Sequence, residues 1–110
     1  MKSIYLDNTS TTKMLPEVKR AMLPYFDARY GNASSRHKMG RDAEHALSMS
    51  RKKIAGLLGA KEKEIVFTSG ATEAINLAIL GSARSLRHRG KHIITSMIEH
   101  DAVLEPCRKL

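Results

Sequence analysis

The segment of residues 68–76, Thr-Ser-Gly-Ala-Thr-Glu-Ala-Ile-Asn, has the residue types of a phosphate-binding turn. It follows a short apolar run and opens an expected helix. A helix N-terminus leaves backbone N–H groups unpaired and carries partial positive charge, so an anion is stabilised there. Gly70 can adopt conformations that other residues avoid and lets the backbone approach closely. Ser69 and Thr72 add hydroxyl donors. The turn therefore predicts a phosphate cup formed by Ser69, Gly70, Ala71 and Thr72.

The same residues also suit an ordinary helix start. Ser69 or Thr72 would cap the helix and Gly70 would ease the turn, so the residues alone leave capping and anion binding equally open. The spacing matches neither a Walker A loop nor the Gly-x-Gly-x-x-Gly dinucleotide fingerprint. Glu73 suits the helix dipole but would repel a phosphate. Its carboxylate is therefore expected to point away from the cup, in a structural role.

His100 and Cys107 are the other candidates for chemistry. His100 follows Ser96 by four residues, at the expected C-terminal edge of a strand, where an imidazole could stack on a cofactor ring or move protons. It also fits a polar loop residue before a helix capped by Asp101. Cys107 has no neighbouring motif that would activate a thiol, and it is expected to be a packed small residue.

Composition excludes several classes of function. Of the 110 residues, 42% are hydrophobic and 27% charged, which argues against global disorder. No run reaches the roughly 20 apolar residues of a membrane span, no targeting segment is present, and the single cysteine fits a cytoplasmic protein.

The net charge of +8 comes with few aromatic residues, so a specific nucleic-acid partner is not expected. Gly90 separates His88 from His92, and no metal site is predicted.

The elements that would position these residues alternate between helix and strand. A first helix is expected at Pro16, and a second carries an apolar stripe of 3.6-residue period that Gly59 ends. Residues 65–68 and 92–96 are short apolar runs, typical of strands buried on both faces. Further helices are expected at residues 71–87 and 101–110. The stripe consists of Ala43, Ala46, Leu47, Ser50, Ile54, Leu57 and Leu58.

This order of strand and helix predicts an α/β fold with a βαβ unit of a mainly parallel sheet. Two parallel strands do not form a stable sheet by themselves, and the last expected helix has no stop signal. The chain is therefore expected to be the opening part of a larger domain. Residues 1–13 would form an N-terminal arm, and residues 14–110 the incomplete first part of the large domain.

Four motifs occur in order along the chain. They are Tyr5-Leu6-Asp7-Asn8 with Thr11-Thr12, Gly31-Asn32-x-Ser34-Ser35-x-His37, Thr68-Ser69-Gly70-Ala71-Thr72-Glu73-x-x-Asn76-Leu77-Ala78, and His92-Ile93-Ile94-Thr95-Ser96 with Glu99-His100. Together they resemble the N-terminal region of cysteine desulfurases of the NifS/IscS type, within the class-V aminotransferases. The resemblance covers essentially all 110 residues but only the opening part of the family's chain.

The resemblance implies the fold-type-I large domain of an enzyme that depends on pyridoxal 5'-phosphate and acts as a homodimer. Such an enzyme takes sulfur from L-cysteine as a persulfide on its own cysteine and leaves L-alanine. The sulfur goes to acceptor proteins such as iron–sulfur scaffolds, or to tRNA thiolation. A selenocysteine lyase or another class-V relative is an alternative, as is a non-catalytic binding module or a subunit of a split enzyme.

By the same resemblance, Ala71 and Thr72 contact the cofactor phosphate through backbone N–H and hydroxyl groups, with Gly70 in the same turn. His100 matches the catalytic histidine that stacks on the cofactor ring and can shuttle protons. The segment near the substrate includes Asn8, Ser10 and Thr11.

The resemblance also implies what residues 1–110 lack. In the family, the lysine that holds the cofactor, the aspartate that pairs with its ring nitrogen, the persulfide-forming cysteine and the carboxylate-binding arginine all lie beyond residue 110. Cys107 does not correspond to that cysteine, so the 110-residue chain alone is expected to be inactive. Ser10 stands where the family has alanine, and Ala33 where it has proline, which removes a rigid φ from that loop.

Overall fold

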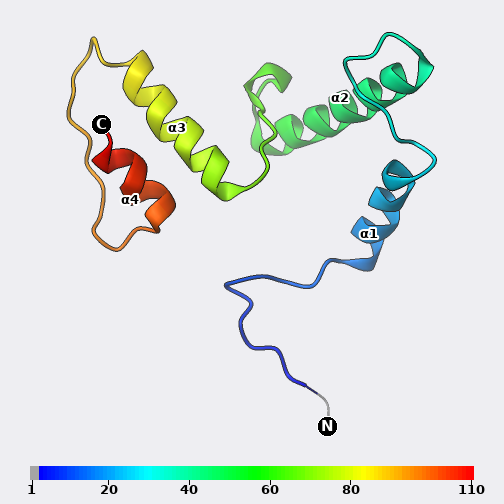
Figure 1. Ribbon diagram of the computed structural model, residues 1–110, viewed down its shortest axis with the longest axis horizontal. Coiled ribbons are helices and arrows are strands. Elements are labelled where there is room, and N and C mark those ends of the chain that lie inside the picture. Colours follow the sequence, from blue (N-terminus) through cyan, green and yellow to red (C-terminus); the bar gives the residue numbers. More distant parts are fainter. Residues whose placement is uncertain (1–2) are drawn as a thin grey trace. The chain divides into compact units, whose positions relative to one another are not determined.

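The computed structural model describes residues 3–110, and the elements in this range are helices (Figure 1). Residues 1 and 2 of the predicted arm lie outside it. The described chain forms two compact units, of which the first ends at Ile65 and the second spans Val66–Leu110. The predicted division at residue 13 concerns the complete large domain and stays a prediction.

The first unit begins with an extended arm and a short helix, α1 (Pro16–Met22). Pro16 occupies the first helical turn, as predicted, where its missing N–H would have no partner in any case. A 3-10 turn, η1 (Leu23–Phe26), continues the helix. No residue of α1 or η1 is buried, so apolar side chains such as Val18 and Phe26 are open to solvent.

The longest helix is α2 (Lys38–Leu58). It ends at Gly59, as predicted, because Gly59 adopts the left-handed conformation with φ 64° while the Ala60 N–H donates to the Ala55 carbonyl oxygen at 2.9 Å. The predicted apolar stripe is only partly buried. Leu57 is 87% exposed, whereas the buried Ala55, 2% exposed, lies outside the stripe. A second 3-10 turn, η2 (Glu62–Glu64), follows and packs against α2.

The second unit is a pair of helices, α3 (Ala71–Ser85) and α4 (Asp101–Arg108), which lie side by side (Figure 1). Both helices were predicted, and their observed ends differ from the predicted ends by no more than two residues. Ile79 and Leu80 of α3 are half-buried, and Ala102 and Pro106 of α4 are buried.

The segments predicted as strands, residues 65–68 and 92–96, form no strand in the described range. Their apolar side chains are open to solvent: Val66 is 64% exposed and Ile94 88% exposed. A helix closes its hydrogen bonds within one segment, but a strand must pair with another strand, and a strand that is apolar on both faces also needs cover on both. The predicted βαβ unit therefore stays unformed among residues 3–110, while the helices around it form.

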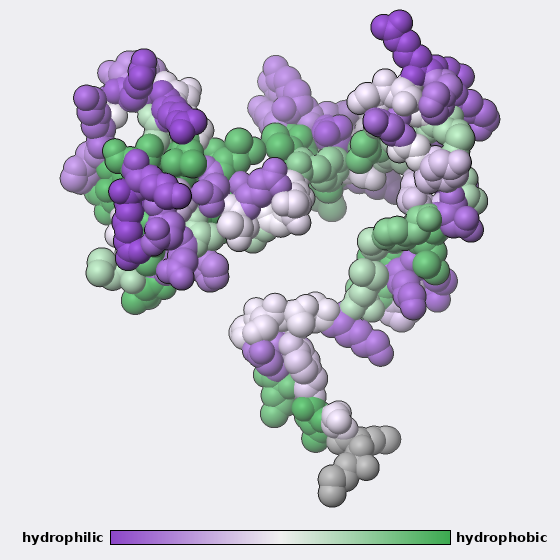
Figure 2. Space-filling model, viewed as in Figure 1, coloured by the Kyte–Doolittle hydropathy of each residue, from purple (hydrophilic) through white to green (hydrophobic). Residues whose placement is uncertain are grey.

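Apolar side chains lie at the surface of both units. Among the described residues, only Ala55 and Ala102 are buried hydrophobic residues, while Ile98 is 94% exposed. Figure 2 shows apolar surface over the N-terminal arm and α1. These faces are available for packing, as expected for part of a larger domain. No helix among residues 3–110 is both long enough and apolar enough to cross a membrane.

Candidate functional site

The predicted phosphate cup lies at the exposed start of α3. The first backbone bond of this helix runs from the Ala74 N–H to the Gly70 carbonyl oxygen, at 3.1 Å. The N–H groups of Ala71, Thr72 and Glu73 precede that bond, and in the described chain none of them has a hydrogen-bond partner. No side chain caps the helix at Gly70. Three backbone donors therefore remain available to an anion, at the end of the helix that favours negative charge.

Gly70 contributes space rather than an unusual backbone conformation. Its φ of 169° and ψ of −177° describe extended backbone that any residue adopts, so the expectation of a conformation other residues avoid is wrong. A Cβ atom built at Gly70 would meet no atom within 4 Å. The backbone just before the helix is therefore open on that side. It is steadied by the Thr68 hydroxyl, which donates to the Gly70 carbonyl oxygen at 3.2 Å.

Glu73 points back toward the cup, contrary to expectation. Its Oε2 atom accepts both the Ser69 N–H at 2.7 Å and the Ser69 hydroxyl at 2.6 Å. The two donations from Ser69 lower the pKa of the Glu73 carboxyl below its ordinary value. Ser69 lies just before the helix, so the Glu73 carboxylate pairs with donors of the preceding turn and leaves the first N–H groups of α3 unpaired. The role is structural, as expected, but it removes Ser69 from the donors available to a ligand.

The Thr72 side chain complements the open N–H groups. Its hydroxyl has no hydrogen-bond partner within residues 3–110, and the residue is exposed. Neither Ser69 nor Thr72 caps α3, so the capping role that the residues allowed is not observed, while anion binding stays a prediction. The structure thus brings Gly70, Ala71 and Thr72 together as an open donor site.

His100 caps α4. Its Nδ1 atom accepts the Ala102 N–H at 3.0 Å. The cap is therefore His100, whereas the sequence had allowed a cap by Asp101. Because Nδ1 accepts, a neutral imidazole here carries its proton on Nε2. The ring is exposed, and its Nε2 has no hydrogen-bond partner in the part of the chain that the structure describes. The Nδ1 atom of His100 therefore has a structural role, while its Nε2 atom remains available for chemistry.

Asn76 is a site residue to which sequence reasoning gave no role. Its Nδ2 atom donates to the Thr72 carbonyl oxygen at 2.9 Å and lies 3.5 Å from the Ala102 carbonyl oxygen. It thereby links the cup turn of α3 to the first turn of α4. The available signal was a polar side chain on the helix face that also carries the half-buried Ile79 and Leu80.

The residues expected near the substrate lie in the first unit. Asn8 and Ser10 belong to an exposed turn in which the Ser10 N–H donates to the Asp7 carbonyl oxygen at 3.2 Å. The Thr11 N–H reaches the same oxygen at 3.5 Å, and the Tyr5 hydroxyl donates to it at 2.8 Å. The arm therefore has local structure of its own. That Asn8, Ser10 and Thr11 approach a substrate stays a prediction.

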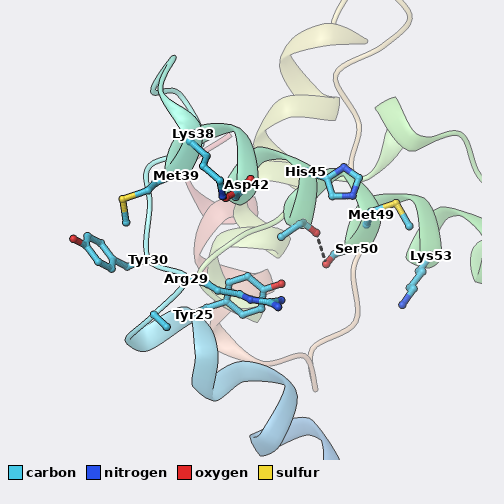
Figure 3. A pocket seen from close by; sticks show the side chains of 12 residues that line it. Tyr25, Arg29, Tyr30, Lys38, Met39, Asp42, His45, Met49, Ser50 and Lys53 are labelled. Carbon is cyan, nitrogen blue, oxygen red and sulfur yellow. Dashed lines mark hydrogen bonds and ion pairs between the residues drawn. The ribbon is translucent and has the colours of Figure 1, made fainter.

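A pocket of about 610 Å³ lies in the first unit against α2 (Figure 3). Its lining combines Tyr25, Arg29 and His45 with the pair of Lys38 and Asp42, whose Nζ and Oδ2 atoms are 2.6 Å apart. The hydrogen bond from Lys38 lowers the pKa of the Asp42 carboxyl. No residue here was predicted as a site. In the described residues, no three His, Cys, Asp or Glu side chains gather in a way that could hold a metal ion.

Residues 4–110 match the family model described as Aminotransferase class-V. The chain therefore belongs to the class-V aminotransferase family, and the resemblance found in the motifs is confirmed.

Named relatives narrow the likeness. The chain is 53% identical over 106 residues to the cysteine desulfurase IscS of Methanosarcina thermophila, covering 96% of this chain and 26% of the relative. It is 50% identical over 109 residues to the cysteine desulfurase IscS of Dictyoglomus turgidum, covering 99% and 28%. Among solved structures it resembles a NifS-like protein with a TM-score of 0.89 and 40% identity, over 96% of this chain and 29% of that one. The chain thus spans less than a third of the length of these relatives.

Proposed function

We propose that this chain is the N-terminal part of a pyridoxal 5'-phosphate-dependent cysteine desulfurase, which converts L-cysteine to L-alanine and a protein-bound persulfide. The observation that carries the proposal is the uncapped start of α3 in a class-V aminotransferase, with the N–H groups of Ala71, Thr72 and Glu73 unpaired. Its closeness to two proteins named cysteine desulfurase supports the choice of reaction.

The residues of the cup fit a phosphate group. A phosphate offers acceptor oxygens only, and the open side of the cup offers donors only: three N–H groups and the Thr72 hydroxyl. The one nearby carboxylate, on Glu73, is occupied with Ser69. When bound, pyridoxal phosphate supplies an electron sink for chemistry at the substrate.

Different residues of the chain would have different roles at the site. The start of α3 would hold the phosphate, with Gly70 leaving space beside it and Thr72 adding its hydroxyl. His100 would lie against the cofactor ring, with its cap bond at Nδ1 orienting the ring and Nε2 left to hold or move a proton. Asn8, Ser10 and Thr11 would lie near the substrate, as the resemblance implies.

The fold proposal follows the same likeness. We infer that residues 65–68 and 92–96 become parallel strands of one sheet in the complete fold-type-I large domain, with α3 in the connection between them. The likeness to the NifS-like protein, with a TM-score of 0.89, supports this inference. That protein is more than three times as long as this chain. Strands supplied from outside residues 3–110 would cover the exposed Val66 and Ile94.

Other parts of the proposal rest on the resemblance alone. They are the homodimer, the transfer of sulfur to acceptor proteins such as iron–sulfur scaffolds, and the cytoplasmic location. A selenocysteine lyase remains the main alternative, since the residues expected to distinguish the two enzymes lie outside this chain.

The test uses the longest natural polypeptide that carries this chain. Purified with pyridoxal phosphate, it is expected to show visible absorbance of bound cofactor and to release L-alanine from L-cysteine, whereas the 110-residue chain does neither. L-selenocysteine as the only productive substrate would select the lyase. A polypeptide of the relatives' length that binds no cofactor would overturn the proposal, and turnover by the 110-residue chain would contradict the residue assignments.

A further inference from the structure

We propose that Asn76 is a positioning residue that holds His100 in place relative to the phosphate cup. The inference rests on the proposed function, and it adds a residue whose role is to connect two parts of that site. Asn76 is half-buried on α3, one helical turn after Thr72. Its side-chain amide faces a carbonyl oxygen of its own helix and one of α4.

The polar contacts form a continuous path. Asn76 Nδ2 donates to the Thr72 carbonyl oxygen at 2.9 Å and faces the Ala102 carbonyl oxygen at 3.5 Å. A primary amide carries two N–H groups, so Nδ2 can serve both acceptors. At the other side of the same residue, the Ala102 N–H donates to His100 Nδ1 at 3.0 Å. The cup residue Thr72 and the imidazole are therefore joined through one side chain and one backbone unit.

The rest of the contact between α3 and α4 does not supply this precision. The side chains of these helices that are buried or half-buried include the apolar Ile79, Leu80 and Pro106, and apolar contact has no preferred direction. The connection between the helices, residues 86–100, contains no helix or strand in the described chain. A hydrogen bond depends on distance and angle, so the Asn76 amide can fix the register of the two helix starts.

A displaced imidazole would matter for catalysis more than for stability. Misplacing a catalytic group by about 1 Å can cost up to about 100-fold in rate. A residue that only stabilises the helix pair would instead lower stability without acting through His100. The experiment has to separate these two roles.

The experiment compares Asn76→Leu with Ser82→Ala in the holoenzyme of the longest natural polypeptide that carries this chain. Leucine keeps the approximate size and removes both donors; Ser82 is exposed on the same helix without a side-chain hydrogen bond in the described range. For Asn76→Leu, kcat for L-cysteine is expected to fall roughly 10- to 100-fold while KM changes less than about threefold. Ser82→Ala is expected to match the wild type. If Asn76→Leu fails to fold, Asn76→Asp, which keeps the size and also lacks donors, takes its place.

A double-mutant cycle gives the decisive readout. In a His100→Gln background, Asn76→Leu is expected to change kcat by less than about twofold, because the group that Asn76 positions is already gone. An equal loss in both backgrounds would show a merely structural role and overturn the inference.

Two readouts do not depend on turnover. The visible circular dichroism of bound pyridoxal phosphate is expected to change in Asn76→Leu and not in Ser82→Ala. In cofactor-free protein, the imidazole signals of His100 in long-range ¹H–¹⁵N correlation are expected to shift in Asn76→Leu and not in Ser82→Ala, while the cap bond within α4 keeps the Nε2–H tautomer in both. Unchanged His100 signals in Asn76→Leu would contradict the path through Ala102. A wild type that binds no pyridoxal phosphate would defeat the proposed function, whereas an active wild type with silent Asn76 variants would defeat only the role of Asn76.

Discussion

The starts of α3 and α4 differ in whether a side chain accepts a hydrogen bond from their unpaired N–H groups. Each helix begins with N–H groups that have no partner inside the helix. At α4 the His100 side chain accepts one of them, at 3.0 Å from the Ala102 nitrogen. At α3 no side chain does so, and the Glu73 carboxylate turns back to Ser69 instead. The start of α4 therefore presents the imidazole of His100, and the start of α3 presents free backbone donors. The first can hold or move a proton, and the second can bind an anion.

This contrast also explains why capping patterns alone do not identify an anion site. Ser69 and Thr72 are good capping residues by type, yet neither caps α3. His37 at the start of α2 resembles His100, since its Nδ1 faces the Gly40 N–H at 3.4 Å. The α3 start differs from both because its cap position is a glycine.

The largest expected effect separates the observed role of His100 as a cap from its proposed catalytic role. In the holoenzyme, His100→Asn is expected to keep a cap on α4, since asparagine is among the best N-cap residues, but to remove the imidazole. Desulfurase activity should then fall by about 10²- to 10⁴-fold, while the denaturant midpoint stays near that of the wild type. Activity retained at the wild-type level would show that His100 serves only as a cap.

A smaller loss is expected when one donor of the open start is removed. Ala71→Pro deletes an N–H at the first helical position, where proline is compatible with a helix and with the extended Gly70 before it. The dissociation constant of pyridoxal phosphate should rise roughly 10- to 100-fold, since hydrogen bonds to charged groups contribute about 1.5–3 kcal/mol. Equilibrium titration measures this. Unchanged affinity would mean that the Ala71 N–H does not face the phosphate.

The pH dependence of stability tests the role of Glu73. Its carboxyl pKa is lowered from the ordinary value of 4.5 by the Ser69 donors, so the stabilisation is present above about 4.5 and is lost as the pH falls through the lowered pKa. Glu73→Ala should therefore be less stable than the wild type at pH 7, and the difference should disappear in acid. Urea unfolding at several pH values checks this. A difference that persists in acid would point to a cause other than the carboxylate.

The smallest effect is expected at Ser69. Ser69→Ala removes one of the two donors to Glu73 and leaves the other, the backbone N–H at 2.7 Å. Because Ser69 donates to Glu73 and not to the open side of the cup, cofactor affinity should change less than about threefold, well below the loss of a direct phosphate contact. A loss as large as that of Ala71→Pro would show that Ser69 leaves Glu73 when the cofactor binds.

The sequence by itself determined the features that depend on neighbours along the chain. It predicted the starts of α1, α3 and α4, the end of α2 at Gly59, and the cup turn before α3. Helical hydrogen bonds, terminal glycines and unpaired N–H groups at a helix start all arise within a few residues, so they can be inferred from local pattern. The four motifs also predicted the family, because the order of motifs along a chain can be recognised without knowing which residues are in contact.

Only the tertiary structure decided what depends on contacts between segments. The docking of α4 on α3 turned Asn76 from one polar residue of a motif into a link to Ala102. The cap by His100 in place of Asp101 and the return of Glu73 to Ser69 are local contacts, but they depend on side-chain geometry that residue types alone do not encode. Burial followed the same principle. Residues 65–68 and 92–96 have the composition of inner strands, but a strand forms only when it pairs with another strand, and among residues 3–110 neither segment does so.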